Sequence, residues 1–154
     1  MSHKFPFFRA LPAYLGGKRR LCGVIFALLA QVVERERWRG MTFIDPFMGG
    51  GSMSLYGKAC GFRVLCNDVA LRSAAIGRAL IANSAVRLTQ VDVAAVLREP
   101  SEVYPRLAEE EFYPRVFSRE HAQVIDRALY WLHTGQIPEP RRSLLALLLT
   151  KWIL

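Results

Sequence analysis

The stretch from Phe43 to Ser52, FIDPFMGGGS, constrains the fold of this chain more than any other. A short apolar run ends at Asp45, Pro46 prevents its continuation, and three glycines follow directly. Glycine allows positive φ and removes the Cβ that would keep a neighbouring group away from the backbone. Such a loop is either a tight turn without function or a place where a ligand lies against the main chain.

The segments around this loop alternate between strand and helix patterns. The predicted strands are residues 41–45 and 62–66, and the predicted helices are residues 18–38, 52–60 and 70–83. Gly40 and Gly61 end the first two helices. The order of strand, glycine loop, helix and strand is that of a βαβ unit. It predicts an α/β protein with a doubly wound parallel sheet and helices on both faces.

The second half of the chain has weaker patterns. Residues 88–97 fit either a strand or the start of a helix, and the three prolines within residues 100–117 predict an excursion on the surface. Ser118 is a predicted N-cap of a helix that runs to His133. Residues 143–154 form a strongly apolar helix. Such a helix is expected to be buried, so it either fills the core or is covered by something that the chain lacks.

The composition predicts one globular domain over residues 1–154, with 52% hydrophobic residues. No run approaches the roughly 20 apolar residues that span a membrane, and the N-terminus has no secretory signal pattern. Cys22, Cys60 and Cys66 lack the spacing of metal ligands. They are most simply buried thiols in a reducing compartment, which predicts a cytoplasmic protein without a metal site.

Basic residues are concentrated at the start of the chain. The formal net charge is +8, and residues 1–40 contain eight Lys or Arg against two Glu, a net charge of +6. Lys and Arg side chains bind polyanions because they release counterions from phosphates. The charge therefore favours a nucleic-acid partner as strongly as it favours solvated helix ends.

The residues beyond the loop indicate what kind of ligand would bind. Asp68 ends the second predicted strand, 17 residues after Gly51, where a carboxylate can accept hydrogen bonds from a ribose or simply cap the next helix. A dinucleotide fingerprint would have glycine where this chain has Ser54, and it lacks the Asp-Pro-Phe entry. A nicotinamide-linked oxidoreductase is therefore disfavoured. A ligand with a charged amino group and a ribose, such as S-adenosylmethionine, fits better.

Three segments in this order resemble the N6-adenine-specific DNA methyltransferases of the Dam-like or D12 class. They are PAYLGGKRRL (residues 12–21), FIDPFMGGGS (residues 43–52) and CND (residues 66–68), and the likeness covers roughly residues 9–85. The resemblance implies a Rossmann-like methyltransferase fold, S-adenosylmethionine as the cofactor and double-stranded DNA as the substrate, as in restriction-modification. Residues 100–117 would then begin a DNA-recognition insertion.

The resemblance also implies cofactor-binding residues. Tyr14 and Gly17 would pack near the cofactor, and Lys18 would lie beside its charged groups. Asp45 would lie near the methionine amino group, and Phe47 would form part of the pocket floor. Gly49 and Gly51 would shape the loop, and Asp68 would bind the ribose hydroxyls. Simpler roles compete with these. Lys18 also fits an exposed cation in a basic cluster, and aromatic side chains such as Tyr14 and Phe47 more often pack in a core.

The family's catalytic motif, Asp-Pro-Pro-Tyr, does not occur in this sequence. In that motif a carboxylate and a carbonyl accept the hydrogens of adenine N6, and the aromatic ring stacks on the flipped base. This chain has no Pro-Pro pair, and its only Asp-Pro is Asp45-Pro46. It therefore resembles the N-terminal portion of such an enzyme and is predicted to be inactive alone, with no catalytic residue of its own.

Three explanations stay open for the missing motif. The chain is a fragment, or one subunit of a split enzyme whose second polypeptide supplies the catalytic half, or a non-catalytic nucleic-acid-binding or assembly module. Each predicts self-association through the last helix unless a partner covers it, because exposed apolar patches recruit partners.

Overall fold

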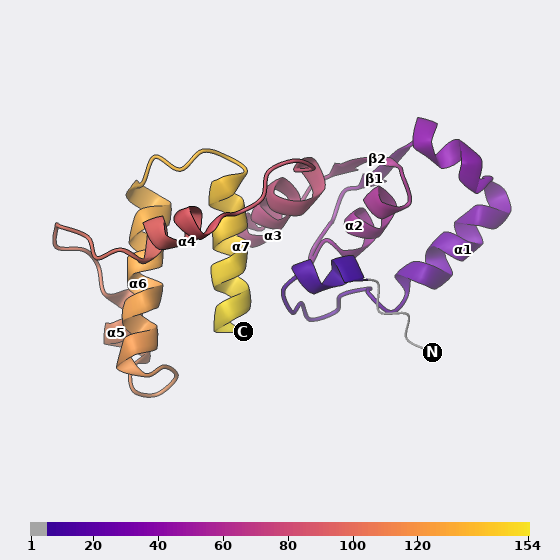
Figure 1. Ribbon diagram of the computed structural model, residues 1–154. Helices are drawn as coiled ribbons and strands as arrows, with labels where there is room; N and C mark the ends of the chain where they lie inside the picture. The colour runs from indigo at the N-terminus through magenta and orange to yellow at the C-terminus, as the bar shows by residue number, and fades with distance from the viewer. Residues whose placement is uncertain (1–5) are drawn as a thin grey trace.

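The computed structural model describes residues 6–154 and has two parts laid side by side (Figure 1). The elements in chain order are η1 (Pro6–Ala10), α1 (Cys22–Val32), η2 (Arg35–Gly40), β1 (Thr42–Asp45), α2 (Ser52–Ala59), β2 (Arg63–Cys66), α3 (Leu71–Ile76), the π-helical η3 (Gly77–Ala82), α4 (Gln90–Leu97), α5 (Leu107–Phe112), α6 (Arg119–Thr134) and α7 (Arg141–Ile153). The strands, α1 and α2 form one part, and α4 to α7 form the other.

The two strands are parallel and are joined through α2, as the βαβ prediction requires. Their register pairs Thr42 with Arg63 and Asp45 with Cys66, so both strands end at the same edge of the sheet. Backbone bonds continue past this edge, because Asn67 N–H donates to the Asp45 carbonyl at 2.9 Å. The glycine loop and Asp68 therefore follow neighbouring strand ends. An α/β fold is confirmed, but residues 6–154 contain only this two-stranded sheet.

The described residues do not confirm the prediction of helices on both faces of the sheet. Phe43 and Val64 point toward the helices and are partly buried, whereas Ile44 and Leu65 on the opposite face are 66% and 49% exposed. Both strands thus alternate between covered and open positions. Parallel sheets are normally covered on both faces, so the open face is unusual for this architecture. The sequence could not reveal it, since apolar outward residues predict a buried face.

An aromatic cluster joins α1 and η2 to the covered face. Phe26, Trp38 and Phe62 are buried, and the rings of Trp38 and Phe62 stack with centroids 5.0 Å apart. This packing explains why the helix predicted over residues 18–38 is interrupted. The chain extends at Val33, whose carbonyl accepts a 3.0 Å hydrogen bond from Trp38 Nε1. Burying Trp38 replaces the last turns of a continuous helix with the 3₁₀ turns of η2.

The helices of the second part begin at defined caps. The segment predicted as either a strand or a helix start contains the helix α4 (Gln90–Leu97), and Thr89 and Asp92 make a reciprocal capping box at its start. Ser118 caps α6 as predicted and accepts a 3.3 Å hydrogen bond from His121 N–H. The carboxylate of Asp126, a buried residue of α6, accepts hydrogen bonds from the backbone N–H groups of Ala108 and Glu109 in the first turn of α5.

The surface excursion predicted for residues 100–117 is wrong in part. It contains α5, and both Tyr104 and Ala108 are buried, the latter against α6.

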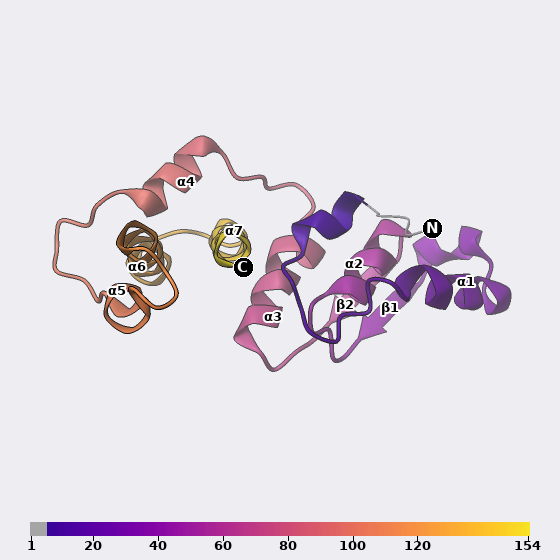
Figure 2. The ribbon, with the colours of Figure 1, turned by 90° about the horizontal axis from the view of Figure 1, so that it is seen from below.

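For the apolar last helix, the sequence predicted either burial in the core or a surface left without its cover. The structure shows some of each. As Figure 2 shows, α7 lies between α6 and α3. It buries Leu145 and Leu147, but Trp152 near its end is 50% exposed.

Candidate ligand-binding site

A cavity of about 410 Å³ opens where β1 ends and the glycine loop begins. Six of the eight residues predicted to bind a cofactor line it: Tyr14, Gly17, Lys18, Asp45, Phe47 and Gly49. They come from two separate segments, residues 14–18 and 45–49, and the other lining residues include Ile25 of α1 and Ser52 and Met53 of α2. The volume is within the range of roughly 300–1,000 Å³ that is typical of small-molecule sites. Sequence segments far apart therefore converge on one hollow.

The glycines of the loop are required by Tyr14 of the same chain. A Cβ on Gly50 would lie 2.7 Å from Cβ and Cγ of Tyr14, and a Cβ on Gly49 would lie 3.3 Å from its ring. Real Cβ atoms do not tolerate the first distance, so any larger residue at position 50 displaces the tyrosine. The close approach that the three glycines predicted is thus made by a side chain rather than by a ligand. Tyr14 lies on the loop and forms one wall of the cavity.

Gly51 has a different role from its two neighbours. Its φ of +75° is in the left-handed region, and a Cβ there would lie 2.9 Å from Ile76 Cγ2. Gly51 therefore shapes the loop, as the resemblance implied, by turning it into α2 against the hydrophobic core. It does not line the cavity.

Asp45 presents its carboxylate at the end of β1. Its Oδ2 accepts a 2.6 Å hydrogen bond from Ser54 Oγ, and Ser54 in α2 is fully buried. The turn after β1 directs the side chains of Phe47 and Met48 into different environments. Met48 is buried in the core, whereas Phe47 is 85% exposed. Phe47 therefore lies at the rim of the cavity and not in its floor, which corrects the sequence prediction.

Asp68 does not line this cavity. Its Oδ1 accepts the N–H of Ala70 at 2.9 Å, and its Oδ2 accepts the N–H of Gly49 at 2.7 Å. These two hydrogen bonds hold the pKa of Asp68 below its ordinary value. The side chain lines a second hollow of about 350 Å³, together with Cys66, Asn67 and part of α3 and η3. Gly49 thus connects the carboxylate to the cavity.

Arg72 of α3 holds Tyr14 in place, a role that the sequence did not predict. Its guanidinium carbon is 5.5 Å from the centroid of the Tyr14 ring, and Nη2 donates to the Ala13 carbonyl. A cation stacked on an aromatic ring 58 residues away leaves no local pattern in a sequence. Ser54 does leave such a pattern, since it occupies a position where a dinucleotide-binding loop has glycine.

The two basic runs of the N-terminal region lie at opposite ends of α1. Lys18 lines the cavity, and Arg20 follows it before the helix begins. Arg35, Arg37 and Arg39 belong to η2, directly before the amino end of β1. The 11 residues of α1 separate the two runs by about 16 Å. Only the first run is placed to contact a polyanion that reaches the cavity.

No group of His, Cys, Asp or Glu among residues 6–154 is arranged to hold a metal ion. Burial raises the pKa of the Cys22 thiol to about 11, and it also raises the pKa values of Cys60 and Cys66. Within the described part of the chain, no helix has both the length and the apolar character to cross a membrane.

The arrangement defines a class of site before any comparison is made. A mixed polar and aromatic cavity beside a glycine loop, at the carboxyl end of parallel strands, is typical of α/β proteins that bind nucleotide-like ligands. The family of D12 class N6 adenine-specific DNA methyltransferases matches residues 14–134, and the chain belongs to this family. No curated protein and no solved structure matches it.

Proposed function

We propose that this chain binds S-adenosylmethionine in the cavity beside Tyr14 and Asp45, as the cofactor-binding part of a DNA adenine N6-methyltransferase with a Rossmann-like fold. The observation that carries the proposal is the convergence of six predicted residues on one cavity. The family match supports methylation of adenine in DNA.

The charged groups of the cavity are complementary to those of the cofactor. The Asp45 carboxylate suits the ammonium group of the methionine moiety, and the Lys18 ammonium suits its carboxylate. The ring of Tyr14 offers an apolar face on which part of the ligand can lie. Asp68 is bonded to Gly49, so a ligand that extends past this glycine would bring its ribose hydroxyls to the carboxylate. The residues present therefore fit the cofactor.

These residues would bind and orient the methyl donor, but the chemistry needs one more group. When bound, S-adenosylmethionine supplies an electrophilic methyl group on its sulfonium. The sequence has no Asp-Pro-Pro-Tyr motif to accept the N6 hydrogens of adenine. We expect residues 1–154 alone to transfer no methyl group. Double-stranded DNA in the cytoplasm would be the substrate, approached from the side of Lys18 and Arg20.

Photo-crosslinking of S-adenosylmethionine labelled in its methyl group tests this assignment. Trypsin cleavage after Arg9, Lys18, Arg39 and Lys58 releases residues 10–18 and 40–58, which together contain seven of the eight predicted residues. Label is expected on one or both peptides and should be lost when excess unlabelled cofactor is present. Label confined to residues 88–154 would contradict the proposal.

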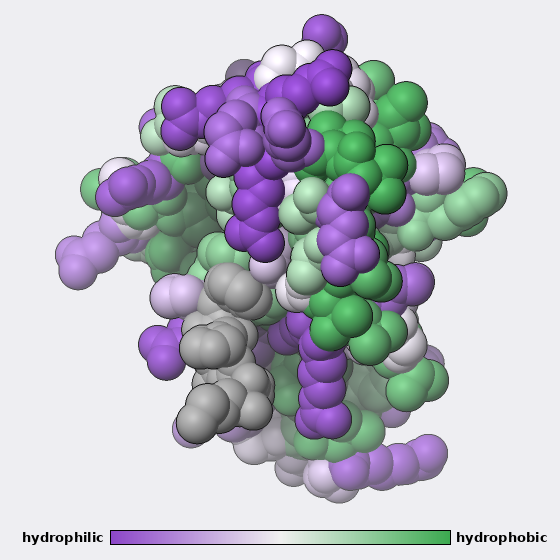
Figure 3. All heavy atoms as spheres, turned by 90° about the vertical axis from the view of Figure 1, so that its right-hand side faces the viewer, coloured by the Kyte–Doolittle hydropathy of each residue, from purple (hydrophilic) through white to green (hydrophobic). Residues whose placement is uncertain are grey.

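A second candidate function is a non-catalytic assembly module, favoured by the apolar surface on the side of α1. Figure 3 views that side and shows hydrophobic side chains gathered between charged ones. The exposed apolar residues there include Leu21, Val24, Leu28 and Val32, and Ile44 and Leu65 are exposed on the open sheet face. Trp152 adds an exposed ring on the last helix, through which copies could associate. A module of this kind would bind a protein partner and no S-adenosylmethionine.

A further inference from the structure

Ser54 occupies the position at which a dinucleotide-binding loop has its third glycine. That glycine allows the helix to pack closely on the strand. Here the side chain is present, fully buried, and its hydroxyl reaches from α2 to the carboxylate that ends β1 at 2.6 Å. A short O–H···O⁻ hydrogen bond of this kind is a strong one. The loop thus replaces close backbone packing with a polar contact between the helix and the strand end.

The contact determines how the carboxylate faces the cavity. A carboxylate at a strand end can turn about its side-chain torsions, but the Ser54 bond holds Oδ2 against α2. Among residues 6–154, no hydrogen bond reaches the second oxygen, Oδ1. Asp45 lines the cavity, so its remaining hydrogen-bonding capacity is available there. Ser54 itself does not line the cavity and therefore acts only through Asp45.

We propose that Ser54 is a positioning residue, which fixes the Asp45 carboxylate so that it receives the ammonium group of the cofactor's methionine moiety. This inference rests on the proposed function. A purely structural role, tying α2 to β1, would stabilise the fold without regard to which part of a ligand is bound. The two roles can be separated with ligands that differ only in the amino-acid moiety.

The experiment is calorimetric titration of wild type and Ser54→Ala with S-adenosylmethionine and with 5′-methylthioadenosine, which lacks the amino-acid moiety. Loss of an ordered charged contact should weaken binding of S-adenosylmethionine about tenfold. Binding of methylthioadenosine should change by less than about twofold, because it makes no contact with Asp45. Ser143→Ala is the matched control. Ser143 is also buried and accepts a 3.1 Å hydrogen bond from Arg78 Nε, but it does not line the cavity.

If Ser54→Ala does not fold, Ser54→Cys retains the volume with a weaker donor, and the same ratio between the two ligands is measured. An equal effect on both ligands, or no effect on either, would overturn the positioning role while the proposed function stands. Wild type that binds neither ligand would instead overturn the proposed function, and the inference with it.

Discussion

The two parts of the molecule contain equal numbers of basic residues but neutralise them differently. Residues 6–76 and residues 77–154 each have ten Lys or Arg, against four and nine Asp or Glu respectively. All five ion pairs found among the described residues lie within residues 77–154, for example between Arg127 and Glu99 at 3.0 Å. The first part therefore retains a positive potential that the second part has largely cancelled.

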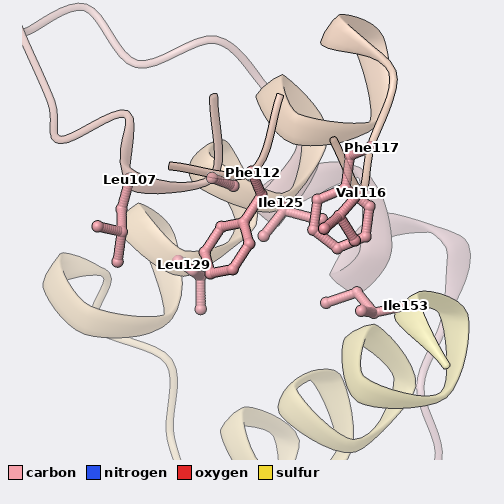
Figure 4. A pocket seen from close by; sticks show the side chains of 8 residues that line it. Leu107, Phe112, Val116, Phe117, Ile125, Leu129 and Ile153 are labelled. Carbon is pink, nitrogen blue, oxygen red and sulfur yellow. The ribbon is translucent and has the colours of Figure 1, made fainter. Parts of the chain in front are cut away.

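The hollows of the two parts also differ in whether charged residues line them. The helical part has a hollow of about 290 Å³ between α5, α6 and the end of α7, lined by apolar side chains such as Phe112, Leu129 and Ile153 (Figure 4). A second hollow of about 390 Å³ between α4, α6 and α7 is also lined by apolar residues. The cavity beside the glycine loop instead contains Asp45 and Lys18. Recognition of a charged ligand is thus expected in the first part, and helix packing dominates the second.

The largest effect is expected where the first part depends on its aromatic cluster. Phe26→Ala should lower the free energy of unfolding by about 4 kcal/mol, because a fully buried ring is replaced by a cavity. Urea denaturation followed by tryptophan fluorescence measures this. Phe112→Ala is the control in the helical part, where the ring is 44% exposed and the loss should be much smaller. Equal losses of unfolding free energy in the two variants would contradict the greater dependence of the first part on its aromatic cluster.

Asp126→Ala should destabilise the helical part without affecting the cavity. The carboxylate accepts the N–H groups of Ala108 at 2.7 Å and Glu109 at 3.0 Å, and its loss leaves both donors without their partner. We expect the free energy of unfolding to fall by about 3 kcal/mol. The affinity for S-adenosylmethionine, measured at a temperature where the variant is folded, should not change. A parallel loss of affinity would show that the two parts are coupled.

Asp68→Ala should mainly lower the affinity for S-adenosylmethionine. If the carboxylate binds the ribose, its removal should weaken S-adenosylmethionine binding roughly 10- to 150-fold, since a hydrogen bond to a charged group contributes about 1.5–3 kcal/mol. Calorimetric titration measures the change. A weakening of less than about twofold would exclude Asp68 from the site and leave it as the hydrogen-bond partner of Ala70 and Gly49.

Alkaline pH should reveal the buried thiol beside α2. The pKa of Cys22 is raised to about 11 in the folded chain, from 9.0. The unfolded chain then loses this proton first, so the contribution is complete below pH 9 and is lost as the pH rises toward 11. Wild type should lose about 2 kcal/mol relative to Cys22→Ala over this interval. A difference that does not vary with pH would contradict the burial of the thiol.

The smallest effect concerns the two ends of α1. Arg20→Ala should reduce the salt dependence of DNA binding by about one counterion, because Arg20 lies at the end that reaches the cavity. Arg37→Ala, at the opposite end, should change it less. Fluorescence anisotropy with duplex DNA at several salt concentrations measures both slopes. A larger effect of Arg37→Ala would place the DNA on the other side of the molecule.

Local patterns in the sequence predicted the elements of the first part. The glycines, Asp45 and Asp68 mark the ends of strands, and their spacing was sufficient to predict the parallel pair and the helix between them. Six of the residues singled out as cofactor-binding candidates line one cavity. Phe47 was misplaced, because the sequence does not show which of two adjacent apolar residues turns into the core.

Contacts between distant residues were out of reach of the sequence. Tyr14 lies on Gly50, Arg72 stacks on Tyr14, and the break in the first helix follows from the burial of Trp38. Each depends on the positions of whole elements rather than on a local preference. The open face of the sheet has the same origin, because Ile44 and Leu65 are as apolar as residues that are covered.

The central claim is that the first part of the chain forms an S-adenosylmethionine site. Calorimetric titration of the purified chain with S-adenosylmethionine, and with NAD as the control, tests it most directly. We predict saturable binding of S-adenosylmethionine, loss of that binding in Asp45→Ala, and no binding of NAD. Binding of NAD in preference to S-adenosylmethionine, or binding of neither, would contradict the claim.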